Sequence, residues 1–202
     1  MTEKELDARI KAQIFDKRKG EFTFGATTGF KKKLDSLLKK ENRVEIGELF
    51  GTDLKHPHGR DKIFRELNPD LTNKEFKAIR AKNKKVKGLY IWFSNGKPFY
   101  VGISGKIAKR LHQHINNQSH YSASMAYKIA YLVFGFVFDD DFEGDGKETT
   151  AKFSKKKIKE IQKWLKKQEV SYVPIDDNDE LALFEIFCSL ELKIRLNSFE
   201  TT

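Results

Sequence analysis

Two short apolar and aromatic runs lie on either side of a polar segment near the middle of the chain. The runs are residues 88–93 (GLYIWF) and 99–103 (FYVGI), and residues 94–98 (SNGKP) separate them. β-Branched and aromatic residues around an Asn-Gly pair are typical of two antiparallel strands joined by a tight turn. An apolar residue then recurs every four residues from Ile107 to Ile115, which predicts one face of a helix. Residues 88–120 therefore predict a strand, a turn, a strand and a helix.

Most of the remaining apolar pattern has helical spacing. Helices are expected at residues 3–19, 28–41, 60–67, 72–85, 122–134, 155–168 and 180–192, and one further strand at residues 170–175. The residues before Gly88 thus predict a mainly helical region, and those after it a mixture of strands and helices. We therefore expect a boundary at Gly88, with one region at residues 1–87 and another at residues 88–202.

The charge is distributed unevenly between these two regions. The chain has 39 Lys and Arg against 29 Asp and Glu, a net charge of +10; residues 1–87 hold 23 and 14 of these, and residues 88–202 hold 16 and 15. Nearly all of the net positive charge lies before Gly88. This excess predicts that residues 1–87 bind a polyanion such as DNA. The alternative is a solvated helical surface without a partner.

Composition also excludes several classes of protein. The single cysteine, Cys188, cannot form an intrachain disulfide or a cysteine-rich zinc site, and its apolar neighbours predict a buried thiol. No apolar stretch reaches the ~20 residues that a transmembrane helix needs. The charged N-terminus lacks the apolar core of a signal peptide. We therefore expect no membrane partner and a cytoplasmic location.

One carboxylate has unusual surroundings. Glu185 lies between Phe184 and Ile186, in a predicted helix whose apolar residues surround most of its circumference. Burying a carboxylate is costly unless it is paired or holds a cation. Glu185 is therefore the candidate metal ligand, and a single carboxylate favours one Mg²⁺ ion, for which Mn²⁺ can substitute, with several waters left on it. The alternative is an exposed Glu on the one polar face of this helix.

The order of these features resembles the GIY-YIG nuclease superfamily. The chain has, in order, Gly88-Leu89-Tyr90, Tyr100-Val101-Gly102, Arg110, His114, Glu185 and Asn197. It departs from the family name at Leu89 and Val101, which replace isoleucine with another apolar residue. The resemblance covers residues 88–202, with an insertion at about residues 139–168.

The resemblance implies a fold and a division of the site between distant helices. The fold class is α/β (α+β): a small three-stranded antiparallel sheet flanked by helices, preceded here by the basic, mostly helical residues 1–87. The hairpin would supply two strands, and residues 170–175 the third. Arg110 would project from the first helix after the hairpin, and Glu185 from the last helix.

The resemblance also implies roles for single residues. The implied catalytic set is Tyr90, Tyr100, Arg110, His114, His120 and Glu185. Tyr90 is the family's candidate general base; because free tyrosine has a pKa near ~10, this role needs nearby positive charge to favour the phenolate. Tyr100 would hold the water or the phosphate, and His114 or His120 would relay a proton.

Three cations and one amide are the candidate substrate contacts. Arg110 offers a planar, permanently charged fork for a phosphate. Lys106 and Lys109 lie on the same predicted helix and are expected to contact the nucleic-acid backbone. Asn197 matches the asparagine near the C-terminus of the family and is expected to position the substrate or the fold.

The sequence therefore predicts a divalent-metal-dependent endonuclease that hydrolyses DNA, in the first place a sequence-specific restriction endonuclease. A homodimer would suit a palindromic site. Two alternatives stay open: a structure-selective repair or mobile-element nuclease, and a non-catalytic nucleic-acid-binding protein on the same scaffold.

Overall fold

The computed structural model describes residues 1–14, 28–50, 72, 74, 86–117, 119, 121–134, 155–194 and 196. Within these ranges the helices are α1 (Glu3–Ile14), α2 (Thr28–Leu38), α3 (Ile46–Phe50), α6 (Ile107–Asn116), α7 (Ser124–Phe134), α8 (Lys155–Lys166) and α9 (Asn178–Glu191), with a 3₁₀ turn at Lys40–Asn42. The predicted helix at residues 60–67, and all but two residues of the one at 72–85, lie outside the described residues. No helix in the described ranges has both the length and the apolar character needed to cross a bilayer.

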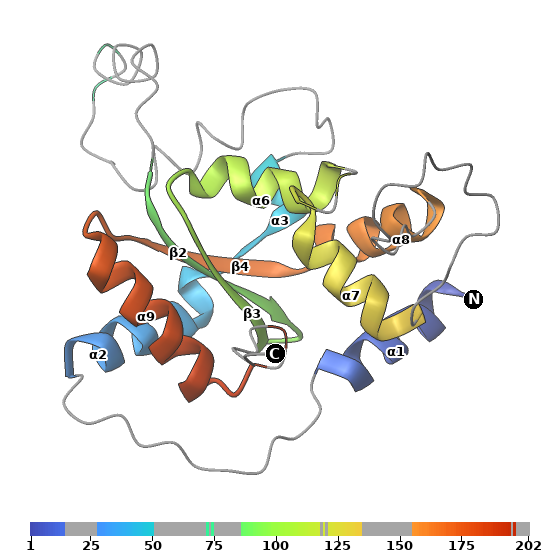
Figure 1. The fold of residues 1–202 in the computed structure, drawn as a ribbon, viewed down its shortest axis with the longest axis horizontal. Helices are drawn as coiled ribbons and strands as arrows, with labels where there is room; N and C mark the ends of the chain where they lie inside the picture. Colours follow the sequence, from blue (N-terminus) through green and yellow to red (C-terminus); the bar gives the residue numbers. More distant parts are fainter. Residues whose placement is uncertain are drawn as a thin grey trace, which may run out of the picture.

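The strands form one antiparallel sheet with the order β1–β4–β2–β3 (Figure 1). They are β1 (Val44–Glu45), β2 (Gly88–Ser94), β3 (Lys97–Ser104) and β4 (Glu169–Pro174). The predicted hairpin and third strand are confirmed. The prediction of three strands missed β1, in which Val44 pairs with Val170 and Glu45 with Glu169. A strand of two residues is too short for an alternating pattern to reveal it.

The β2–β3 hairpin has a tight turn and a bulge. Asn95 and Gly96 have φ angles of 50° and 74°, the pair of positive values that a type I′ turn requires. The pairing register shifts after Trp92, which lies opposite Tyr100, while Phe93 lies opposite Pro98. One extra residue on β3 is thereby accommodated as a bulge, which changes the direction of the side chains near Tyr100.

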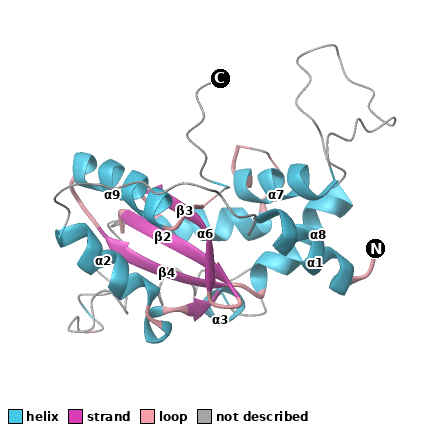
Figure 2. Ribbon diagram, turned by 90° about the horizontal axis from the view of Figure 1, so that it is seen from below, coloured by secondary structure: helices cyan, strands magenta, loops and turns pink. Residues whose placement is uncertain are grey.

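Two groups of helices cover the sheet (Figures 1 and 2). On the side that carries Tyr90 and Trp92, α6 contributes His114 and α8 contributes Trp164, whose ring centroid lies 5.4 Å from that of Phe99. On the other side, α2 and α9 pack together through Phe30, Phe184 and Phe187. Tyr90 and Tyr100, which the sequence predicts to be catalytic, thus face α6, and α9 runs beside β3.

The described helices before Gly88 share this core. Leu6 and Ile10 of α1 are buried, and α1 packs on α7. Asp7 accepts a hydrogen bond of 2.8 Å from the indole Nε1 of Trp164. Ile46 of α3 is also fully buried. These residues therefore contribute to the hydrophobic core around the sheet.

Helix α9 begins two residues before the predicted start, at Asn178. The Asp177 side chain accepts a 2.7 Å hydrogen bond from the backbone N–H of Glu180, which satisfies a free donor at the helix start. The buried residues of α9 include Leu181, Phe184, Phe187 and Cys188, which confirms the buried thiol. However, Leu183 is 51% exposed and Ile186 is 36% exposed. The expectation that α9 is buried on all sides is therefore wrong: one face is buried and the other is exposed. Glu185 is half-buried between these two faces.

Candidate active site

Both tyrosine triplets contain a glycine because the backbone approaches another group closely. A Cβ atom at Gly88 would lie 2.0 Å from the carbonyl oxygen of Val173 on β4. A Cβ atom at Gly102 would lie 2.6 Å from Oη and Cζ of Tyr90, and 2.9 Å from the Tyr100 ring. The Tyr90 ring therefore lies over the glycine of the neighbouring strand, and its side chain is 1% exposed.

We expect Gly102→Ala to displace the Tyr90 ring. The added methyl group overlaps buried ring atoms that cannot move away freely, so the free energy of unfolding should fall by about 2–4 kcal/mol. Urea denaturation of the two proteins measures this change. Gly105→Ala is the matched control, because a Cβ atom there meets nothing within 4 Å. Equal losses of stability in the two variants would contradict the close approach at Gly102.

Tyr90 and His114 form a buried pair. The Oη atom of Tyr90 lies 3.0 Å from Nε2 of His114, and the His114 side chain is 0% exposed. Burial lowers the pKa of His114 to about 3, and the positive charges of Arg110 and Lys128 act in the same direction. The imidazole is therefore neutral at physiological pH, so one of its ring nitrogens can accept a hydrogen bond, but in this environment it is a weak base.

Tyr90 is a phenol in the ligand-free protein. Burial raises its pKa well above the ordinary value of 10.0, and the neighbouring Tyr100 adds to this shift. The positive charge of Arg110 lowers the pKa, as the sequence suggested, but burial outweighs it. The pKa of Tyr100 is also raised by burial, against the opposing charge of Arg110. Arg110 alone therefore does not produce a resting phenolate at Tyr90, and the proton needs a defined acceptor.

Arg110 is held by the segment that leads into α7. Its Nη1 atom donates to the carbonyl oxygens of Ser122 at 3.0 Å and Tyr121 at 3.4 Å, and its Nη2 atom donates to Oγ of Ser124 at 2.8 Å. Arg110 also lines an open pocket of about 270 Å³ at the start of α6, together with Ser104, Gly105, Lys106, Lys109 and Gln113. The structure thus brings together the three cations that the sequence assigned to the phosphate.

The Glu185 carboxylate has the properties of a cation ligand. It lies close enough to Tyr90 and Tyr100 for its negative charge to raise the pKa of both phenols. Burial raises its own pKa. Within the described residues, no hydrogen bond or ion pair reaches this carboxylate. A half-buried carboxylate without a partner suits a bound cation, whose charge would compensate for the lost hydration.

The donor set suits one ion that keeps several non-protein ligands. Among the described residues, no group of three or more His, Cys, Asp and Glu side chains could hold a metal together. Mg²⁺ is commonly bound through one or two carboxylates plus waters and phosphate oxygens. Glu185 alone fits that kind of site, and the raised phenol pKa values place it beside the tyrosines.

Lys128 of α7 is a site residue that the sequence analysis missed. Its positive charge lowers the pKa of both Glu185 and His114, so it faces the same region. Its Nζ atom donates to the carbonyl oxygen of Leu196 at 3.2 Å. Lys128 lies four residues after Ser124, the partner of Arg110, and therefore on the same face of α7. The chain pattern marked only the apolar side of this helix, so it gave no signal for Lys128.

Gln162 of α8 is a second residue that the pattern did not indicate. It is 5% exposed and its Nε2 atom donates to the carbonyl oxygens of Asn117 at 2.6 Å and His114 at 3.5 Å. These are carbonyl groups at the C-terminal end of α6, where intrahelical donors run out. The predicted insertion at residues 139–168 thus contributes a buried residue that holds the helix of His114 in place.

His120 and Asn197 lie outside the described residues, so their roles stay predictions. His112, which the sequence analysis left outside the catalytic set, packs edge-on against Phe50 with ring centroids 5.6 Å apart.

Comparison with known proteins agrees with this arrangement. A sequence model of the GIY-YIG catalytic domain matches residues 64–202, more than half of the chain. The chain therefore belongs to the GIY-YIG family. It is a nuclease of the GIY-YIG type, as the order of its tyrosine triplets, arginine and glutamate had indicated. A search of curated proteins and a search of solved structures found no match.

Proposed function

We propose that this protein is a divalent-metal-dependent DNA endonuclease and, within that class, a sequence-specific restriction endonuclease. The observation that carries the nuclease proposal is the convergence of Tyr90, Tyr100, Arg110, His114 and Glu185 from two strands and two helices. Each group that phosphodiester hydrolysis needs is present: a cation for the phosphate, a route for the proton of water, and a ligand for a metal ion.

Arg110 binds and orients the scissile phosphate in this proposal. Its guanidinium is fixed by Ser122 and Ser124, so little rotational freedom is lost when the substrate binds. Lys106 and Lys109 border the same pocket and neutralise the adjoining phosphates. The shared pocket supports placing the phosphate at the N-terminal end of α6, where backbone N–H groups also favour an anion.

Tyr90 and His114 act as a proton relay. The oxygen of water attacks phosphorus while its proton passes to Oη of Tyr90, and the phenol proton passes to Nε2 of His114, 3.0 Å away. The P–O3′ bond breaks, the 3′-oxygen takes a proton from solvent, and the products carry a 5′-phosphate and a 3′-hydroxyl. The 3.0 Å contact supports this path. Because a pKa of about 3 makes His114 a weak base, the transfer needs the negative charge of the bound phosphate to raise that pKa.

Glu185 is the proposed ligand of Mg²⁺, with Mn²⁺ as a substitute. When bound, the ion supplies Lewis-acid stabilisation of negative charge on the phosphate and the departing oxygen. The negative charge of this carboxylate reaches Tyr100 and raises its pKa, and Tyr100 would hold the water or a phosphate oxygen by hydrogen bonding. His120 and Asn197 are proposed as further contacts to the proton path and the substrate.

Residues 1–87 are assigned the recognition of a DNA sequence. If that sequence is palindromic, two copies of the chain would bind it as a homodimer. The excess of positive charge in residues 1–87 supports this assignment. The buried thiol of Cys188 is compatible with the reducing cytoplasm as the place of action.

Cleavage of supercoiled plasmid DNA with Mg²⁺ or Mn²⁺, followed by sequencing of the ends, tests the proposal. Discrete fragments that share one end sequence would support a restriction endonuclease. Cutting only at branched or flapped structures would replace that subclass with a structure-selective nuclease. Binding without cleavage under every divalent ion would overturn the enzymatic proposal.

A further inference from the structure

Helix α8 presents a stripe of lysines opposite its buried face. Its apolar residues Ile158, Ile161, Trp164 and Leu165 are all at most 5% exposed. The exposed lysines Lys156, Lys159 and Lys163 are separated by three and four residues, so they lie along one side of the helix. At 1.5 Å per residue the stripe is about 10 Å long.

This stripe differs from the other lysine-rich surface of the described structure. On α2, Lys31 pairs with Asp35 and Lys33 with Glu180, and just beyond the helix Lys39 pairs with Glu41. In contrast, no hydrogen bond or ion pair joins the three stripe lysines to any described residue. Glu160 is the one acidic residue within α8.

The stripe also lies beside further positive charges on the same helix. The pKa of Lys166 is lowered by burial and, in addition, by the positive charge of Lys163. At the end of the helix, Lys167 forms an ion pair with Glu3 of α1. The lysines of α8 repel one another, and the helix has too few acidic residues to offset this repulsion. An anion bound along the stripe would reduce it.

We propose that Lys156, Lys159 and Lys163 form a second DNA-backbone contact, outside the catalytic site. One DNA strand carries a phosphate about every 3.4 Å along its axis, so a stripe of about 10 Å spans about three phosphates. The proposal rests on the proposed DNA endonuclease function. An apolar surface for membrane insertion is lacking, because the apolar residues of α8 are used in the core.

The stripe is fixed relative to the catalytic helix. Gln162, on the buried side of α8, bonds to the carbonyl oxygens at the end of α6, whose other end carries Lys106, Lys109 and Arg110. A duplex that contacts both surfaces would therefore be held in one register against the site. This arrangement gives the predicted insertion at residues 139–168 a function in substrate binding.

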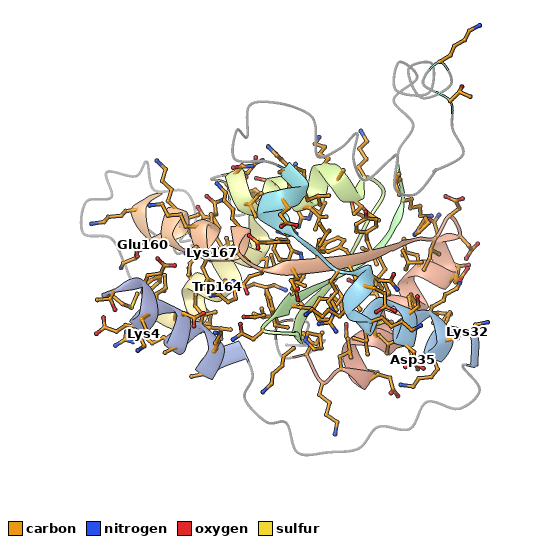
Figure 3. The ribbon with its side chains drawn as sticks, turned by 180° about the vertical axis from the view of Figure 1, so that it is seen from behind. Lys4, Lys32, Asp35, Glu160, Trp164 and Lys167 are labelled. Carbon is orange, nitrogen blue, oxygen red and sulfur yellow. The ribbon has the colours of Figure 1, made fainter. Side chains whose placement is uncertain are left out.

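The test replaces the three stripe lysines with glutamine in the full-length protein and measures binding to a 40-base-pair duplex across a salt series. Each lost phosphate contact should reduce the slope of log K against log [salt] by about 0.9, so the triple variant should lose up to about 2.7. Its Kd at low salt should rise roughly tenfold or more. The control replaces Lys97 and Lys193 with glutamine; these exposed lysines lie outside α8 and outside residues 1–87, so the control gives the loss of slope per lysine away from the stripe. Lys167, just after α8, and Lys32, on α2, lie at opposite ends of the molecule (Figure 3).

Four outcomes decide the proposal. A larger loss of slope per replaced lysine in the stripe variant than in the control, with an unchanged rate of cleavage at saturating DNA, supports it. Equal losses per lysine in the two variants overturn it. A loss of rate at saturation also overturns it, because the stripe would then act within the catalytic site. If the wild-type protein binds DNA but never cuts it, the proposed enzymatic function fails, and the slopes still support or overturn the stripe.

Discussion

Glu185→Gln is expected to reduce DNA cleavage by about 10³-fold or more. A divalent ion contributes several kcal/mol to the stabilisation of the transition state, and Glu185 is the proposed carboxylate that would hold it near Tyr90 and Tyr100. The amide keeps the shape of the side chain but loses the charge. Single-turnover cleavage at saturating Mg²⁺ measures the effect. Glu191→Gln, at the exposed end of the same helix, is the control and should cleave at the wild-type rate.

The same change should make the metal-free protein slightly more stable at neutral pH. Burial raises the pKa of Glu185 above 4.5, so ionisation of the folded protein costs more than ionisation of the unfolded chain. This group therefore lowers stability as the pH rises through its unfolded and then its folded pKa. With EDTA present, Glu185→Gln should raise Tm by roughly 1–2 °C at pH 7 and leave it unchanged below the unfolded pKa. A lower Tm at pH 7 would show that the carboxylate has a stabilising partner instead.

Tyr90→Phe is the second change with a large expected effect, a loss of about 10²- to 10⁴-fold in the rate of cleavage. The phenyl ring still fills the space over Gly102, but the proton of the attacking water loses its acceptor. The relay to His114 is broken at the same time, since the bond between Oη and Nε2 no longer exists. Single-turnover rates on plasmid DNA measure the loss.

Two comparisons separate the relay from a general loss of packing. Tyr131→Phe on α7 removes a hydroxyl group from a side chain that is 43% exposed, and should leave the rate unchanged. His114→Ala in the Tyr90→Phe background should cost little further rate, because both groups act in one path. Multiplicative losses in the double variant would show that His114 acts independently of Tyr90.

The local features of the fold were within reach of the sequence. The Asn95-Gly96 turn and the apolar face of α6 each depend on neighbouring residues, and each is found where the pattern placed it. The order of the tyrosine triplets, Arg110 and Glu185 was sufficient to indicate the family. Such signals are local because turn geometry and helical spacing are properties of short segments.

The features that the sequence did not reveal all depend on which elements meet. Gln162 and Lys128 are polar residues in helices whose pattern indicates only an apolar side, and their partners lie 45 and 68 residues away. The protonation of Tyr90 could not be predicted either, because its pKa reflects a balance between burial and the charge of Arg110. Periodicity identifies the face of an element but not its neighbour, so these contacts required the folded structure.

The short strand β1 has a consequence for how much of this chain is needed to fold. The family match begins at residue 64, yet the strand that covers the outer side of β4 consists of Val44 and Glu45. A chain that begins at residue 64 would present the unpaired backbone groups of β4 to solvent, next to the core surface that Ile46 now covers. Exposed strand edges of this kind recruit other chains through new strand pairing. Val44 and Glu45 therefore protect the edge of β4 from strand pairing with another chain. This protection is independent of any part that the N-terminal region has in recognising DNA.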